Sequence, residues 1–504
     1  MSLSVAKLVG VALYLLVLLG IGVVASRRMK DMRDYFAGGK NMGFWSVAFS
    51  ARATGESAWL LLGLTGMGAI HGFHALWVVV GEVVGVGGAW LLMSRRFKDL
   101  TDQYDSLTIP DYLESRFGDT SRRLRVVAAG SLMVFVTIYV SAQIDATGTA
   151  FETFLGWNYY AGMIVGFVVV LVYIISGGFV AVVWSDVFQG ALMGLGLVLL
   201  PIIGLIHAGG WTPVSEGLQR IDPKMLEFGL GDGSLAVLST IALVAIGLGF
   251  LGSPQIFVRF IALRSPDEIN KGAAVAIGWT LFADVGAVMS GMIGRHVLTS
   301  PGQDPSVVLG KGAESVLPML VESILPAFAV GLFIAVVLSA IMSTVDSLLI
   351  VASSAVVRDG YQKILHPEMP DEALVGLSRK VTFALAAVAL ALAATVSAVM
   401  PTRTVFWFVI FGWSGIAATF CPTMILSLFW RGMTANGALA AMISGFLSVP
   451  FFKFAAPHLP GFGAEFGALE ELAPSFAASV VVGVLVSLFG PGEAPATSVP
   501  GSSD

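Results

Sequence analysis

Long apolar segments recur along the whole 504-residue chain, and they constrain its fold more than any other feature. A helix needs about 20 apolar residues to cross the hydrocarbon core of a bilayer. Soluble domains carry about 25% charged residues, whereas this chain has 12% charged and 56% hydrophobic residues. The sequence therefore predicts an all-α polytopic membrane protein.

Taking about 20 residues per crossing, we expect about 13 transmembrane helices. Their approximate ranges are 5–26, 44–70, 74–94, 127–149, 158–175, 180–206, 235–254, 270–295, 326–357, 381–400, 404–430, 435–455 and 472–490.

The basic residues are unevenly divided between the segments that connect these helices. If the N-terminus is outside, 20 of the 28 Lys and Arg residues fall in inside segments, including Arg259, and seven fall in outside segments or their margins. Cytoplasmic loops carry the excess of Lys and Arg. We therefore expect a multi-pass protein of the cell inner (plasma) membrane with the N-terminus outside and the C-terminus in the cytoplasm.

Both ends of the chain have simple interpretations. The first apolar run could be a signal peptide cleaved after Ala25, but Arg27 and Arg28 follow it as a cytoplasmic flank would, which favours a retained span. Residues 491–504 are rich in Pro, Ser and Gly, which predicts a disordered cytoplasmic tail.

Several functional classes lack support in the composition. Basic residues do not cluster as in nucleic-acid-binding proteins, and Cys421 is the single cysteine, so no internal disulfide can form. The six His residues are scattered, and we expect no cofactor or enzymatic centre. Residues 107–125 mix apolar and charged residues at helical spacing, which predicts a cytoplasmic helix along the membrane interface.

The second expected span is interrupted in its middle. Arg52, Gly55, Glu56 and Ser57 lie between apolar residues at a depth where ionisable groups are costly. This segment, 45–65, predicts a site within the bilayer.

A second interruption occurs in the seventh expected span, where residues 246–254 read IGLGFLGSP. The two interrupted helices are five spans apart, and an odd number of spans inverts one group relative to the other. Paired Gly/Pro interruptions in corresponding halves are typical of inverted-repeat transporters with a midplane site. The alternative is that small residues allow close helix packing, which does not explain Arg52 and Glu56.

The ninth span carries polar residues on one helical face. Ser339, Ser343, Asp346 and Ser347 share this face. Hydroxyls can bond back to their own helix, but hydroxyls with a carboxylate also suit a hard cation.

Other ionisable residues lie in spans. Asp145, near Gln143, could neutralise Arg52, and Asp186 is either an interfacial acid or an ion-exit ligand. Glu82 and Asp284 are interpreted equally well as helix-packing partners or as functional groups.

Several motifs together resemble the sodium/solute symporter family, most closely its bacterial sodium/proline branch. They are DYFAGGK at 34–40, WLLLGL at 59–64, TIPDY at 108–112, SGGFVAVVWSD at 176–186, GLG at 247–249 with Pro254, and MST at 342–344. The resemblance implies a LeuT-type core of five plus five inverted helices within one transmembrane domain, residues 1–490. The core would span 44–430, with extra helices at 5–26, 435–455 and 472–490.

The resemblance also implies the cation ligands. The sodium-binding groups would be the backbone carbonyls of Ala53, Glu56 and Ala340 and the hydroxyls of Ser343 and Thr344. Asp186, with Asp346 and Ser347, would form a second cation or release site.

The expected solute pocket departs from the proline-type pattern. Proline-type carriers have an aspartate where this chain has Gly55, a small residue at Arg52, and Trp and Tyr at Ile246 and Phe250. The cation site is kept while the pocket is altered. The expected substrate-binding residues are Arg52, Gly55, Ser57, Trp59, Tyr139, Gln143, Ile246, Phe250 and Pro254.

Together these features imply a sodium-coupled symporter of a small organic solute, an amino acid such as proline. The alternatives are a symporter for another amino acid, a carboxylate or a sugar, and a transporter-like solute sensor. An ion channel and an enzyme have less support. The expected partners are the solute, Na⁺ and the lipid bilayer, and the sequence does not predict an oligomeric state.

Overall fold

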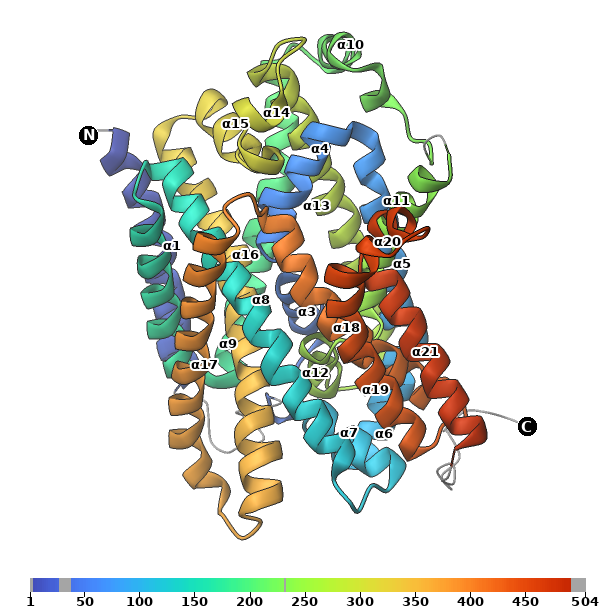
Figure 1. The fold of residues 1–504 in the computed structure, drawn as a ribbon. Coiled ribbons are helices and arrows are strands. Elements are labelled where there is room, and N and C mark those ends of the chain that lie inside the picture. Colours follow the sequence, from blue (N-terminus) through green and yellow to red (C-terminus); the bar gives the residue numbers. More distant parts are fainter. Residues whose placement is uncertain (1–2, 27–37, 231–232, 491–504) are drawn as a thin grey trace.

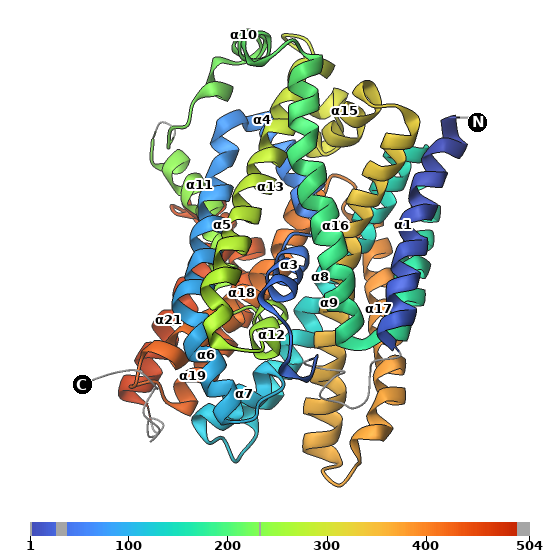
Figure 2. The same cartoon turned by 180° about the vertical axis from the view of Figure 1, so that it is seen from behind.

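The protein is an upright bundle of helices, seen from opposite sides in Figures 1 and 2. This computed structural model describes residues 3–26, 38–230 and 233–490. Within those ranges the chain forms helices and connecting turns, apart from an isolated bridge between Met42 and Leu263. Three features of the sequence lie at least partly outside the described residues. They are the motif at 34–40, the basic residues of the first inside segment except Lys40, and the tail at 491–504.

The first half of the chain supplies the helices on either side of the first interruption. They are α1 (Leu3–Ser26), α3 (Phe44–Gly55), η2 (Trp59–Leu64), α4 (Thr65–His71), α5 (Leu76–Gly88), η4 (Ala89–Met93), α6 (Ser94–Gln103), α7 (Ile109–Phe117), α8 (Arg123–Leu155), α9 (Tyr159–His207) and α10 (Trp211–Ile221).

The second half supplies the second interruption and the helices around it. They are α11 (Ser234–Ala245), η6 (Ile246–Phe250), α12 (Pro254–Ala262), α13 (Ile269–Leu298), α14 (Pro305–Val308), α15 (Val316–Ile324), α16 (Ala327–Ser354), η9 (Ala355–Leu365), α17 (Asp371–Val399), α18 (Val405–Phe429), α19 (Ala435–Pro450), α20 (Gly463–Leu469) and α21 (Leu472–Phe489).

Eleven helices of the described residues are long and apolar enough to cross a membrane. One of them, Trp59–Gln103, covers parts of the expected spans 44–70 and 74–94, and the expected span 158–175 corresponds to a shorter apolar helix, Tyr159–Val169. The thirteen expected crossings thus regroup into fewer continuous helices. The expected range of the seventh span, 235–254, is too short, because the helix resumes after the interruption and continues to Ala262.

The N-terminal helix is part of the bundle. It packs against α9 and α16, and the Tyr14 hydroxyl accepts a hydrogen bond of 2.9 Å from Gln189 Nε2. These contacts favour a retained span over a cleaved signal peptide. The start of α1 and the end of α21 lie at opposite ends of the bundle (Figure 1).

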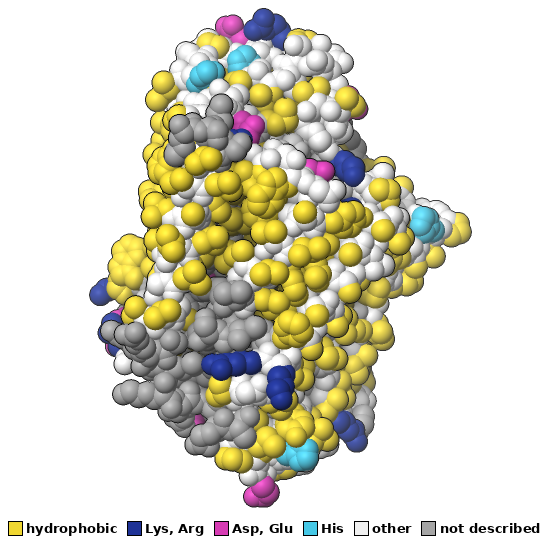
Figure 3. Space-filling model, turned by 90° about the vertical axis from the view of Figure 1, so that its left-hand side faces the viewer, with side chains coloured by type: hydrophobic (Ala, Val, Ile, Leu, Met, Phe, Trp, Pro, Cys, Tyr) yellow, Lys and Arg dark blue, Asp and Glu magenta, His cyan; other side chains and the backbone are white. Residues whose placement is uncertain are grey.

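The molecular surface agrees with a membrane environment. On the face seen in Figure 3, hydrophobic side chains cover most of the middle, and most charged side chains lie towards the upper and lower ends. Leu16, Val84 and Leu92 are among the large apolar side chains that remain exposed. Such a broad apolar surface would be a liability in water but is what a bilayer requires.

Two sequence predictions need correction here. Residues 107–125 do not form one helix along the interface: Ile109–Phe117 is a short helix with buried residues, and Tyr112 Oη lies 3.0 Å from Ser427 Oγ. Arg259, counted among the inside basic residues, lies in α12 and is buried. Because helix α12 re-enters the bundle after Gly252, a loop residue by sequence becomes a core residue.

Candidate functional site

The first helix break lies where the sequence predicts it. Helix α3 ends at Gly55, and Ser57 has a positive φ of 55°, a conformation that costs a non-glycine residue about 1–2 kcal/mol. The Ala58 amide, left without a helical partner, donates a hydrogen bond of 3.0 Å to Gln143 Oε1. A side chain of α8, Gln143, therefore stabilises the non-helical backbone of this break.

The second break lies between η6 and α12. Gly252 has a φ of 150°, and Pro254 begins α12 at a position where its missing N–H costs nothing. Trp413 Nε1 donates a hydrogen bond of 2.9 Å to the carbonyl of Ile246, the first residue of η6. Both expected interruptions are thus confirmed as non-helical breaks.

Helix α16 contacts the first break through its two consecutive hydroxyl residues. Ser343 Oγ lies 2.9 Å from the Ala53 carbonyl oxygen and 3.3 Å from that of Ala340. Thr344 Oγ1 lies 3.2 Å from the Thr54 carbonyl oxygen. The structure therefore places Ser343 beside the carbonyls of Ala53 and Ala340, whereas Thr344 contacts the Thr54 carbonyl, which is not among the five expected sodium ligands.

Glu56, the fifth expected ligand, caps α3. Its amide donates a hydrogen bond of 3.0 Å to the Arg52 carbonyl, and its side chain forms an ion pair with Arg52. The side chain therefore points to a different partner from Ser343. Only its backbone carbonyl is expected to face the sodium ion.

Asp186 is completely buried against α3, so the interfacial-acid interpretation is wrong. Its Oδ2 accepts a hydrogen bond of 2.6 Å from Ser50 Oγ and lies 3.3 Å from Arg259 Nη2. Its Oδ1 has no hydrogen-bond partner among the described residues. A free carboxylate oxygen next to a hydroxyl cluster remains available to a cation.

Ser347 joins this group to α16. Its hydroxyl lies 2.9 Å from Thr54 Oγ1, donates a hydrogen bond of 3.2 Å to Asp346 Oδ1 and accepts one from Arg259. All three residues of the expected second cation site, Asp186, Asp346 and Ser347, are therefore part of one network. We call it the Arg259 network: Ser50, Thr54, Asp186, Arg259, Asp346 and Ser347.

Arg52 lies on another face of α3, and its expected pairing with Asp145 is wrong. Its guanidinium forms ion pairs with Glu56 and, at 3.1 Å, with Glu82 of α5. Asp145 instead pairs with Arg403. The position along the membrane normal alone allows either Glu82 or Asp145 to pair with Arg52. The packing of α5 against α13 and η6 selects Glu82.

Asp284 completes this second group. One carboxylate oxygen from each of Glu56, Glu82 and Asp284 lies within 4.8 Å of the others, and all three residues are buried. We call it the Arg52 network: Arg52, Glu56, Glu82 and Asp284.

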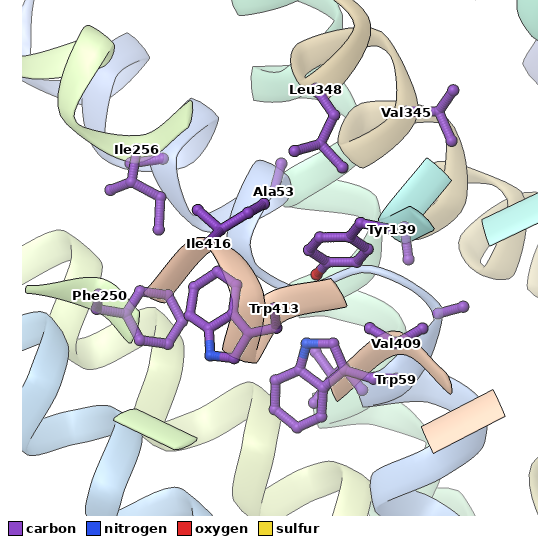
Figure 4. Packing of buried hydrophobic residues seen from close by; sticks show 14 of the residues in the cluster. Ala53, Trp59, Tyr139, Phe250, Ile256, Val345, Leu348, Val409, Trp413 and Ile416 are labelled. Atoms are coloured by element: carbon purple, nitrogen blue, oxygen red, sulfur yellow. The ribbon is translucent and has the colours of Figure 1, made fainter. Parts of the chain in front are cut away.

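Aromatic side chains from four helices, among them Trp59, Tyr139, Phe250 and Trp413, lie near one another between the two breaks (Figure 4). Tyr139 Oη donates a hydrogen bond of 3.3 Å to Ser57 Oγ, and Trp59 Nε1 donates one of 3.3 Å to the Gly55 carbonyl. The Phe250 ring is so close that a Cβ at Gly55 would lie 2.8 Å from it. Glycine at this position therefore makes room for Phe250.

The expected substrate residues are not equally placed. Eight of them lie at the two breaks or bond to residues there: Gly55, Ser57, Trp59, Tyr139, Gln143, Ile246, Phe250 and Pro254. Arg52 turns towards its acids but stacks 4.8 Å from the Phe250 ring centre. Pro254 also lines a small cavity near α7 with Leu107 and Ile350.

Sequence reasoning missed two important residues. Arg259 resembled an ordinary cytoplasmic arginine, and only its position nine residues beyond Phe250 could have suggested a second half-helix. The Trp413 ring lies 5.0 Å from that of Phe250, at a tilt of 55°, and Trp413 bonds to Ile246. It lies in a mostly apolar span, where a tryptophan does not stand out by sequence.

Comparisons with known proteins agree with this geometry. The family model described as "Sodium:solute symporter family" matches residues 35–445. The high-affinity proline transporter PutP of Bacillus subtilis is 36% identical over 469 residues, covering 93% of this chain and 95% of that protein. The sodium/proline symporter of Escherichia coli is 33% identical over 493 residues, covering 97% and 94%.

Solved structures show the same fold. A Na⁺-coupled sialic acid symporter in its substrate-bound outward-open state gives a TM-score of 0.78 at 19% identity, over 98% of this chain and 99% of that one. The crystal structure of MhsT in complex with L-phenylalanine gives a TM-score of 0.53 at 16% identity, over 88% of this chain and 98% of that one. The expected LeuT-type, all-α fold is therefore confirmed. By sequence, fold and the paired helix breaks, the chain belongs to the sodium:solute symporter family, whose members are sodium-coupled transporters and not enzymes.

Proposed function

We propose that this symporter imports proline or a closely related amino acid together with Na⁺. The observation that carries the proposal is the junction of α16 with the first break, where buried Ser343 Oγ lies 2.9 Å from the Ala53 carbonyl. Hydroxyl and carbonyl oxygens of this kind are ligands for a hard cation. The similarity to proline transporters supports the choice of solute.

The proposed sodium site comprises the carbonyls of Ala53, Glu56 and Ala340 with the hydroxyls of Ser343 and Thr344. Sodium at this point replaces the hydrogen bonds that now tie α16 to α3. Asp186, Asp346 and Ser347 are the proposed second cation or release site. Each sodium ion moved inward contributes about 2.3 kcal/mol per 100 mV of membrane potential.

The solute occupies the aromatic space between the two breaks. Backbone groups at the ends of the half-helices bind its charged ends, and the rings of Tyr139, Trp413 and Phe250 enclose its apolar part. Because Phe250 fills the space beside Gly55, the pocket is shaped differently from one that carries an aspartate there. The choice of transported solute therefore depends on Gly55 and Phe250.

We further propose that residues 1–490 form one transporter domain in the cell membrane, with core helices in 44–430 and the N-terminus outside. The retained excess of Lys and Arg in the other inside segments supports this orientation.

Uptake into proteoliposomes tests the proposal. Purified protein is reconstituted, and accumulation of labelled L-proline is measured with an inward sodium gradient and with an equal potassium gradient. We expect accumulation only with sodium, and unlabelled amino acids, carboxylates and sugars are added as competitors. Uptake that ignores sodium would refute sodium coupling, whereas sodium-driven uptake of a competitor alone would refute only proline.

The same preparation separates transport from sensing. A solute sensor would bind L-proline in a sodium-dependent manner without accumulating it. Binding to detergent-solubilised protein, measured in parallel with uptake, distinguishes the two.

A further inference from the structure

We propose that Glu56, Glu82 and Asp284 form an additional sodium site, separate from the Ser343/Thr344 site. The three residues come from the first break, α5 and α13, on a face of α3 that α16 does not reach. The choice of sodium rests on the proposed function, because sodium is the coupling ion of that transporter. The geometry and charge of the cluster are independent of it.

The spacing of the carboxylates suits one cation. One oxygen from each residue lies within 4.8 Å of the others. Oxygen ligands of calcium, a hard cation similar in radius to sodium, lie about 2.3–2.6 Å from the ion. Two ligands on opposite sides of such an ion are therefore up to about 5 Å apart. Small side-chain rotations are enough to bring three oxygens this close to one another into contact with a single ion.

The charge of the cluster calls for a further cation. Three carboxylates face one guanidinium, because Arg52 pairs with Glu56 and Glu82. Asp284 is fully buried, and apart from the neighbouring Glu82 carboxyl its oxygens have no hydrogen-bond partner among the described residues. Burial of an unpaired ionised carboxylate costs several kcal/mol. A cation that binds all three groups removes this cost.

Arg52 pairs with two of the three carboxylates, Glu56 and Glu82. Its guanidinium is held 4.8 Å from the Phe250 ring centre and 5.6 Å from that of Trp279. Apart from the Asp284 carboxyl, Glu82 Oε1 has no hydrogen-bond partner among the described residues. Among these residues the guanidinium forms no ion pair with Asp284, so the contact between the Glu82 and Asp284 carboxyls has no cation of its own.

The proposed ion would act on the solute pocket. Glu56 belongs to the first break, and Arg52 stacks on Phe250, which also contacts Gly55. Sodium in this cluster fixes the break and Phe250 together. It also adds one charge to each transport cycle, which doubles the contribution of the membrane potential if one sodium ion occupies the other site.

Sodium stoichiometry tests the proposal without a transported solute. Equilibrium binding of radioactive sodium to purified full-length protein is measured for wild type, Asp284→Asn and Glu82→Gln. We expect each variant to bind one sodium ion fewer per protein at saturation. Ser343→Ala combined with Thr344→Ala should remove a different ion, so that its combination with Asp284→Asn loses both.

Asp145→Asn is the matched control, because Asp145 is also a buried span carboxylate but pairs with Arg403. It should bind as much sodium as wild type. Unchanged stoichiometry in both Asp284→Asn and Glu82→Gln would overturn the proposal and would indicate that protons neutralise the cluster. Displacement of the ion by trace calcium would overturn the choice of sodium.

A density map of the wild-type protein in sodium provides a check that needs no variant. It should show an ion about 2.4 Å from oxygens of Glu56, Glu82 and Asp284, and an empty cluster would overturn the proposal. Failure of the proposed function looks different. In that case proline uptake ignores sodium, or the Ser343/Thr344 variant keeps its full stoichiometry.

Discussion

Two faces of helix α3 hold buried arginine networks of opposite character. The Arg259 network combines two carboxylates with three hydroxyls and lies beside the Ala53 and Thr54 carbonyls. The Arg52 network combines three carboxylates with one guanidinium and has no hydroxyl among its members. The side of α3 that faces α9 and α16 thus meets carbonyl and hydroxyl oxygens together with an arginine-paired carboxylate, whereas the side that bears Arg52 and Glu56 meets two further carboxylates, from α5 and α13.

This difference shows how one helix break can serve two kinds of site. Hydroxyls and carbonyls bind a cation weakly enough to release it, because they carry no net charge. Carboxylates attract a cation strongly and leave a large cost when it is absent. We therefore predict that neutralising one carboxylate destabilises the protein by different amounts on the two faces of α3.

The largest expected effect is on stability, from Asp186→Asn. This change leaves Arg259 without its directly paired carboxylate, and removal of one partner of a buried pair costs about 3–5 kcal/mol. Glu82→Gln should cost less than about 1 kcal/mol, because Arg52 keeps Glu56 and the excess negative charge falls. The unfolding temperatures of both variants in detergent measure this difference in stability. Equal destabilisation would contradict the predicted difference between the two faces of α3.

The sequence predicts the two faces only in part. Gly55, Gly252 and Pro254 carry strong local signals, because glycine and proline alter helices whatever surrounds them. The polar face of α16 is likewise a property of one helix. The partners of Arg52 and Arg259 are not, since several acids lie at similar depths and only tertiary packing brings one of them into contact.

A third buried network, at the end of the bundle where α7 lies, provides a reference with well-paired charges. Arg125 Nη2 lies 2.8 Å from Asp111 Oδ1, and Arg358 Nε lies 3.4 Å from Oδ2. Burial alone would raise the pKa of Asp111, but Arg358 and Arg125 outweigh it and hold this pKa below its ordinary value. The carboxylate form is therefore the one that stabilises the fold.

Asp111→Asn should destabilise the protein by about 3 kcal/mol at pH 7. A lowered pKa contributes stability above the unfolded value, near pH 4, and this contribution is lost as the pH falls through the folded value. The difference in unfolding temperature between wild type and variant should therefore narrow below about pH 4. A difference that is constant with pH would show that Asp111 acts through packing and not through its charge.

The most direct measurement of the central claim is the sodium dependence of uptake in the Ser343→Ala, Thr344→Ala double variant. Two neutral ligands are lost, and a net hydrogen-bond-sized contribution of about 1 kcal/mol each raises the sodium concentration for half-maximal uptake by roughly tenfold or more. Ser353→Ala, on the same helix but bonded to the Ser378 carbonyl, is the matched control and should keep the wild-type value. A double variant with unchanged sodium dependence would contradict the assignment of the coupling ion to the hydroxyl face of the first break.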